Sequence, residues 1–200
     1  MDINMFHIPL TVYKCSWWKT KKQRLLRHLD TVDFTQGSEQ VLSDYRSDNS
    51  YIPEITDILS DELSWFANDY KCNPHIVRAW YERALPYMYH PTHNHGHGGY
   101  SAVLYIEYDK RYHRPTNFIA PFDHFITGEQ LTYEPHVEEG DLILFPSFLL
   151  HYTQLNESQV QRTVASFNMT VDMNNIPLSW LTSDNMGDSK QTDIKPLSGL

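Results

Sequence analysis

Three histidines, His93, His95 and His97, lie within five residues of one another, and a fourth, His151, ends a separate apolar run. Imidazole is the commonest metal-binding side chain. Residues two apart in a β-strand point to one face, so we expect His93 and His95 to bind one ion, with His151 completing the site from another strand. His95 with His97 is an alternative pair on one face. This layout indicates a mononuclear non-haem iron centre.

Arg162 adds a second, independent signal, because it lies near the start of an expected strand over residues 160–171. A buried guanidinium requires an anion, and its planar fork suits a carboxylate. Iron held by three side chains keeps three positions open, of which a 2-oxo acid takes two and dioxygen the third. We therefore expect Arg162 to bind the distal carboxylate of 2-oxoglutarate. Ser166 and Asn168 share its face, and Tyr105 from a neighbouring strand is expected to add a hydrogen bond.

Three segments of the chain resemble the signatures of a microbial and phage family of 2-oxoglutarate/Fe(II)-dependent oxygenases. They are His-Asn-His-Gly-His-Gly-Gly-Tyr-Ser-Ala-Val-Leu-Tyr-Ile at 93–106, Gly-Asp-Leu-Ile-Leu-Phe-Pro-Ser-Phe-Leu-Leu-His at 140–151 and Arg-Thr-Val-Ala-Ser-Phe-Asn at 162–168. Trp80 lies where that family tends to carry a Trp, and the likeness covers residues 76–170.

The resemblance implies a double-stranded β-helix fold, with Fe(II), 2-oxoglutarate and dioxygen as cofactor and cosubstrates. Succinate and carbon dioxide are the implied coproducts, and we expect ascorbate as the reductant. The implied function is an oxidoreductase, in particular a hydroxylase of a small-molecule or peptide substrate. The resemblance does not name that substrate.

The chain departs from the wider superfamily in one respect, since the usual ligand pair there is His-x-Asp or His-x-Glu. His93 and His95 form a His-x-His pair instead, which leaves the iron site more positive by one unit. A different strand register would bring Glu107 or Asp109 to the site as a carboxylate ligand.

Two other functions remain open. A cupin-like dioxygenase or isomerase would use three histidines without 2-oxoglutarate, although the glutamate usual after a cupin His-x-His is missing from residues 96–106. A non-catalytic module with a structural metal would need a fourth ligand, such as His97 or His136, because closed zinc sites have four.

The pattern of apolar residues predicts helices before the histidine cluster and strands around and after it. Helices are expected over residues 19–34 and 54–70, the second with apolar residues at helical spacing. Strands are expected at 8–13, 75–81, 85–89, 100–108, 117–122, 131–137, 142–145 and 160–171.

This order of elements predicts a mainly β fold with flanking helices, namely a double-stranded β-helix of the jelly-roll or cupin-like barrel kind. We expect a single oxygenase-like domain at 1–172, made of a helical N-terminal flank at 1–75 and a β-helix core at 76–171. Residues 173–200 are polar and contain Pro and Gly, which predicts a loosely packed tail.

Composition limits the partners and the location. The formal net charge of −9 argues against general nucleic-acid affinity, and no apolar run nears the roughly 20 residues that a membrane-spanning helix needs. Cys15 and Cys72 are the only cysteines and no signal peptide is recognisable, which predicts reduced thiols in a cytoplasm, that of the host if the chain is phage-encoded. The sequence leaves an oligomer open.

Overall fold

The computed structural model describes residues 8–34, 40–46 and 51–172. The helices are α1 (Trp18–Leu29), α2 (Ile52–Ile58) and α3 (Ser60–Tyr70). The strands are β1 (Thr11–Lys14), β2 (Leu42–Ser43), β3 (Pro74–Ala84), β4 (His90–His93), β5 (Tyr100–Glu107), β6 (Thr116–Asp123), β7 (Gln130–Tyr133), β8 (Asp141–Pro146), β9 (His151–Thr153) and β10 (Arg162–Val171).

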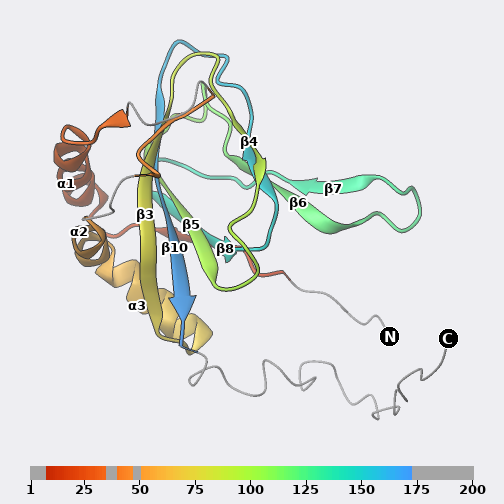
Figure 1. Cartoon of the computed structure of the whole chain (residues 1–200), viewed down its shortest axis with the longest axis horizontal. Helices are drawn as coiled ribbons and strands as arrows, with labels where there is room; N and C mark the ends of the chain where they lie inside the picture. The colour runs from red at the N-terminus through yellow and green to blue at the C-terminus, as the bar shows by residue number, and fades with distance from the viewer. Residues whose placement is uncertain (1–7, 35–39, 47–50, 173–200) are drawn as a thin grey trace.

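The strands form two antiparallel sheets, and the helices cover the outer face of the larger one (Figure 1). The larger sheet has the order β1-β8-β5-β10-β3-β2, and the smaller has the order β4-β9-β6-β7. The expected mainly β fold, a double-stranded β-helix with flanking helices, is confirmed.

Alternation along the strands of the larger sheet divides the interior into two apolar layers. In β10, Ala165 and Phe167 pack toward the helices, whereas Val164 packs between the two sheets. In β5, Leu104 and Tyr105 divide in the same way. The positions of β10 that share the parity of Val164 therefore face the space between the sheets, which is the space that a ligand would enter.

Seven of the eight expected strands are present among the described residues, but the one expected at 131–137 ends at Tyr133, and the helix expected at 19–34 ends at Leu29. The strand expected at 85–89 is wrong, since this segment is a turn in which Tyr87 has a φ of 66°. The strand expected at 75–81 is longer than predicted, because β3 continues to Ala84. Because β3 extends to Ala84, Glu82 belongs to this strand and follows its alternation.

The predicted helix at 54–70 is divided into α2 and α3 at Leu59, whose φ of −98° and ψ of 17° leave the helical range. Basic side chains of α1, which precedes this segment, pair with carboxylates of the same molecule. Lys21, which is buried, lies 2.7 Å from Glu62 of α3, and Lys22 lies 2.7 Å from Glu139. These ion pairs fix α1 against α3 and against the segment before β8.

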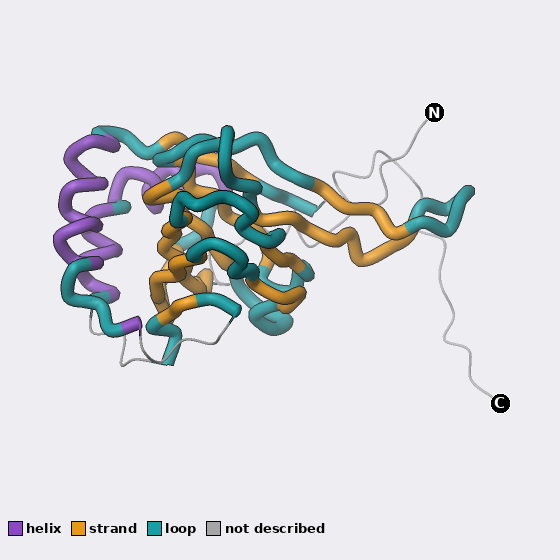
Figure 2. Tube along the Cα trace, turned by 90° about the horizontal axis from the view of Figure 1, so that it is seen from above, coloured by secondary structure: helices purple, strands orange, loops and turns teal. Residues whose placement is uncertain are grey.

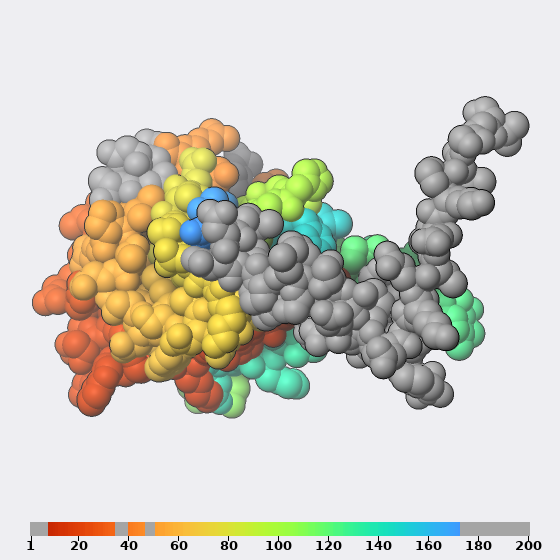
Figure 3. Space-filling view, turned by 90° about the horizontal axis from the view of Figure 1, so that it is seen from below, coloured from red at the N-terminus to blue at the C-terminus, as the bar shows by residue number. Residues whose placement is uncertain are grey.

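The β6–β7 hairpin projects from the body of the molecule (Figure 2), at the opposite end from the helices (Figure 3). No helix within the described ranges is both long and apolar enough to span a bilayer. The tail expected at 173–200 lies outside the described residues.

Candidate metal centre

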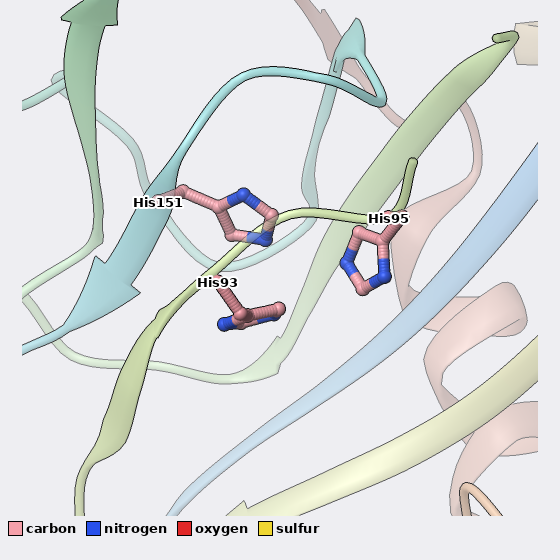
Figure 4. Close-up of side chains that lie close together, drawn as sticks. All are labelled: His93, His95 and His151. Atoms are coloured by element: carbon pink, nitrogen blue, oxygen red, sulfur yellow. The ribbon is translucent and has the colours of Figure 1, made fainter. Parts of the chain in front are cut away.

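His93, His95 and His151 converge on one point (Figure 4). Each offers one ring nitrogen, and these nitrogens all lie within 4.8 Å of one another. The ring centroids of His93 and His151 are 4.3 Å apart, and those of His95 and His151 are 5.1 Å apart. Three imidazole nitrogens at this separation can surround one metal ion.

Strand pairing brings His93 and His151 together from distant parts of the sequence. His93 ends β4 and His151 begins β9, and the two residues are direct partners in the antiparallel register of the smaller sheet. The chain reaches His151 through a turn that starts at Pro146, the last residue of β8 in the larger sheet. The ligand therefore lies where the chain crosses from one sheet to the other.

The position of His95 has a different cause from the one expected, because β4 ends at His93 and His95 lies in the following loop. Its backbone N–H donates to the carbonyl of Ser147 at 2.9 Å. The Ser147 hydroxyl lies 2.9 Å from that of Ser101, which donates to Asn168 Oδ1 at 2.8 Å. A buried polar chain, not a shared strand face, thus connects His95 to β10.

Gly99 allows the loop after the cluster to enter β5. Its φ is +81°, and a Cβ there would lie 2.2 Å from the Met169 carbonyl oxygen. Only glycine accepts both conditions, so Gly99 is what lets the chain pass this close to β10.

The environment keeps the three imidazoles neutral, which is the state that binds a metal. Burial, reinforced by His93, lowers the pKa of His95 to about 4 and that of His151 to about 3. Burial also lowers the pKa of His93. His93 and His151 each place Nδ1 within 2.9 Å of a backbone carbonyl, of Pro91 and Leu149 respectively. Because those nitrogens act as donors, the Nε2 lone pairs are free for an ion.

The alternative ligands lie elsewhere in the described structure. His97 is exposed and is not part of the group of three. Glu107 accepts hydrogen bonds from Gln161 and Thr163, and Asp109 binds Arg111. His136 lines a separate cavity that shares no lining residue with the cavity of the three histidines.

Arg162 lines the same narrow cavity as the three histidines. It is 5% exposed, its Nη1 donates to the Arg114 carbonyl at 3.1 Å, and its Nε has no hydrogen-bond partner. Ser166 lines this cavity too, as its shared parity with Arg162 predicts. An unpaired buried guanidinium nitrogen is costly, so the cavity is suited to an anion.

The other two residues expected at this anion site do not line the cavity. The Tyr105 hydroxyl is fully buried and accepts a hydrogen bond from the backbone N–H of Thr116 at 3.0 Å. Asn168 Oδ1 accepts a hydrogen bond from the Ser101 hydroxyl. Thr116 and Thr153 of the smaller sheet do line the cavity, and sequence reasoning missed them.

Glu82 is the most consequential residue that the sequence did not reveal. It is 6% exposed, and it accepts a hydrogen bond from Trp80 Nε1 at 2.7 Å and lies 3.1 Å from His90 Nδ1. The His90 ring stacks on that of His93 with centroids 4.1 Å apart. Had the strand been extended past Tyr81, the parity of Trp80 would have placed Glu82 at this site.

A family model described as "Putative 2OG-Fe(II) oxygenase" matches residues 78–168 of the chain. This stretch contains the three histidines and Arg162. No curated protein matches the chain in sequence.

Several solved structures share the fold. HygX from Streptomyces hygroscopicus, with nickel, 2-oxoglutarate and hygromycin B bound, is 12% identical with a TM-score of 0.63, covering 82% of this chain and 83% of its own. A 2OG-Fe(II) oxygenase family oxidoreductase from Burkholderia pseudomallei is 10% identical with a TM-score of 0.61, covering 80% and 84%. Viral collagen prolyl hydroxylase from Paramecium Bursaria Chlorella virus-1 is 12% identical with a TM-score of 0.55, covering 80% and 94%.

The TM-scores establish a common fold at low sequence identity. The family match in sequence covers the segment that carries the three histidines and Arg162. Residues 78–168 of the chain therefore match the 2-oxoglutarate/Fe(II)-dependent oxygenase family in sequence, and the rest of the chain lies outside this match.

Proposed function

We propose that the protein is a hydroxylase that binds Fe(II) through His93, His95 and His151 and binds 2-oxoglutarate with Arg162. The observation that carries the proposal is a single cavity lined by three convergent imidazoles and by a buried guanidinium. We propose dioxygen as the second cosubstrate and ascorbate as the reductant.

The residues present fit these groups. Three neutral nitrogen donors suit Fe(II) and leave positions for other ligands. The unpartnered Nε of Arg162 suits a carboxylate, and charge-assisted hydrogen bonds of this kind are the strong ones. The charge of the site also fits a cation. The three ligands include no carboxylate, but the nearby Glu82 carboxylate favours positive charge at all three imidazoles and would favour a bound cation for the same reason.

When bound, the iron and 2-oxoglutarate would activate dioxygen and couple the oxidation of a C–H bond to the release of succinate and carbon dioxide. The protein's own residues orient and shield this chemistry. Arg162 and Ser166 would hold the 2-oxo acid, and apolar neighbours such as Val164 would exclude water from the cavity.

Asn168 and Tyr105 would act through neighbouring residues and not by direct contact with 2-oxoglutarate. Asn168 holds Ser101 and through it Ser147, whose carbonyl fixes His95. Tyr105 holds the start of β6 through Thr116, which lines the cavity. We propose supporting roles for both residues, not the direct contact with 2-oxoglutarate expected from the sequence.

The test is turnover of 2-oxoglutarate. Purified protein with Fe(II), ascorbate and 2-oxoglutarate should form succinate slowly even without its substrate, and His151→Ala should abolish this product. Succinate at the level of a metal-free control would refute the proposal.

A cupin-like oxygenase or isomerase is the second candidate, and the ligand set favours it in one respect, since three histidines need no ligand carboxylate. It predicts that 2-oxoglutarate neither binds nor is consumed. Arg162 argues against it, because a cupin reaction without a 2-oxo acid leaves this guanidinium without an anion.

A further inference from the structure

A second, wider pocket adjoins the candidate metal centre. It has a volume of about 360 Å³ and is open to the surface. It shares five lining residues with the narrow cavity of Arg162, namely Trp80, Glu82, His90, His93 and His95. The two spaces therefore meet at the histidines, and the wider one is large enough for a small molecule.

The outer wall of this pocket comes from the segment 41–46, which includes β2. Val41, Ser43, Tyr45 and Arg46 line it. The segment is held in place by β2 pairing with β3 at Leu42–Arg83. The loops 109–116 and 123–130 contribute no residue to the lining of this pocket.

Aromatic rings form a continuous side of the pocket that leads to the metal centre. Tyr45 packs edge-on against Trp80, with centroids 5.0 Å apart. Trp80 in turn lies 5.3 Å from the ring of His95. A flat or apolar group placed on this side would direct its C–H bonds toward the histidines.

Two residues of opposite formal charge, Arg46 and Glu82, line the pocket, and they differ in whether they have partners. Arg46 is exposed at the mouth and makes no ion pair within the described residues. Behind it, Arg78 lies 4.0 Å over the Tyr45 ring and donates to the Tyr45 carbonyl at 2.6 Å. The one carboxylate in the lining, Glu82, is bound by His90 and Trp80. Because Glu82 already has internal partners, Arg46 is the charged side chain of the lining that is left to attract an anionic ligand.

We propose that this pocket binds the substrate, a small anionic molecule whose carboxylate or phosphate pairs with Arg46 while its apolar or aromatic body lies on Tyr45 and Trp80. This inference rests on the proposed hydroxylase function for its chemistry, but the binding event does not require turnover. The segment 41–46 then determines specificity, and the loops of the β6 side do not.

The experiment uses full-length protein loaded with Zn(II) and saturated with 2-oxoglutarate, so that the Arg162 site is filled. The probes are matched pairs of equal shape, such as 3-phenylpropionate with 3-phenylpropionamide and phenyl phosphate with phenol. Binding is followed by the NMR signal of the Trp80 indole N–H, assigned with Trp80→Phe, and by thermal shift.

We expect the acids to move the Trp80 signal and the neutral partners to leave it unchanged. Arg46→Ala should weaken binding of the acids about tenfold, because it removes a charge-assisted hydrogen bond. Arg111→Ala is the matched control, since it removes an exposed arginine from the loop 109–116, and it should leave the affinity unchanged.

Equal binding of acids and neutral partners would overturn the proposal, as would loss of affinity in Arg111→Ala equal to that in Arg46→Ala, or acids that never perturb Trp80. The same samples separate the two hypotheses. If 2-oxoglutarate binds and the acids do not, the pocket proposal fails alone. If the acids bind in an Arg46-dependent manner and 2-oxoglutarate does not, the proposed hydroxylase function fails alone.

Discussion

Glu82 Oε2 lies 3.1 Å from His90 Nδ1, and this pair of a buried carboxylate and a half-buried imidazole lies beside the three convergent histidines. Burial alone would raise the pKa of Glu82, but His90, Trp80 and Arg162 together hold it well below its usual range. Burial opposes the charge of His90, and the Glu82 carboxylate outweighs this and raises the pKa of His90. A negative charge thus lies near a ligand set that has none of its own.

Replacement of Glu82 by Gln should weaken the affinity for Fe(II) by about tenfold, the lower range for loss of an outer partner at a metal site. The reason is that Gln keeps the size of the side chain but removes the charge that offsets the cation. Isothermal titration with Fe(II) under anaerobic conditions measures the change.

The control is Glu134→Gln, which removes an exposed carboxylate paired with Arg114 at 3.5 Å. If both substitutions changed the affinity equally, the effect would be one of overall charge and not of the Glu82–His90 pair.

Arg162→Lys should raise the concentration of 2-oxoglutarate needed for half-maximal succinate formation by about tenfold or more, because lysine keeps the charge but lacks the planar fork that binds a carboxylate. Metal affinity should stay unchanged, since Arg162 is not one of the three convergent ligands and its guanidinium donates to the Arg114 carbonyl. A parallel loss of metal binding would show that Arg162 supports the fold of the site instead of the 2-oxo acid.

His151→Ala should abolish metal binding, whereas His97→Ala should leave it intact. The sequence leaves His97 open as an alternative ligand from the early cluster, in a pair with His95. In the structure His97 is exposed and outside the group of three, whereas His151 is 3% exposed within it. Metal titration followed by thermal shift distinguishes them. Equal losses in both variants would mean that the coordination sphere includes a fourth histidine.

The two cysteines should react slowly with thiol reagents in the folded protein. Burial, with a contribution from Glu62, raises the pKa of Cys15 to about 12, and burial raises that of Cys72. At pH 8 the thiolate of Cys15 is then about a thousandfold scarcer than in the unfolded chain. Its reactivity should increase with each pH unit up to about 12.

Absorbance on reaction with 5,5′-dithiobis(2-nitrobenzoate) measures this, with Cys72→Ser isolating the signal of Cys15. Rapid labelling of the native protein at pH 8 would show that Cys15 is accessible and ionised. The same measurement tests the expectation that both thiols are reduced.

The sequence was sufficient for the fold and for the three histidines, because both depend on local patterns. Strands β5 and β8 have apolar runs that can be recognised, and His93 and His95 precede the first of these runs while His151 follows the second. The spacing of four residues between Arg162 and Ser166 predicted that both side chains lie on the same face of β10, and both line the cavity.

What the sequence could not provide depends on contacts between distant segments. His95 is placed by the carbonyl of Ser147, a backbone interaction that no side-chain pattern encodes. Asn168 and Tyr105 share the correct parity, but each is occupied by a neighbour on another strand. The segment 41–46 has no periodic pattern of apolar residues that would predict its place in the fold. Its pairing with β3 brings Tyr45 and Arg46 into the lining of the pocket beside the metal centre.

The most direct measurement is an anaerobic titration of the metal-free protein, first with Fe(II) and then with 2-oxoglutarate, followed by calorimetry and visible absorption. We predict one Fe(II) per chain, with 2-oxoglutarate binding only after the metal and producing an absorption band that His151→Ala abolishes. Binding of 2-oxoglutarate that is independent of Fe(II), or no binding of it at all to the iron-loaded protein, would contradict a shared site for the three histidines and Arg162.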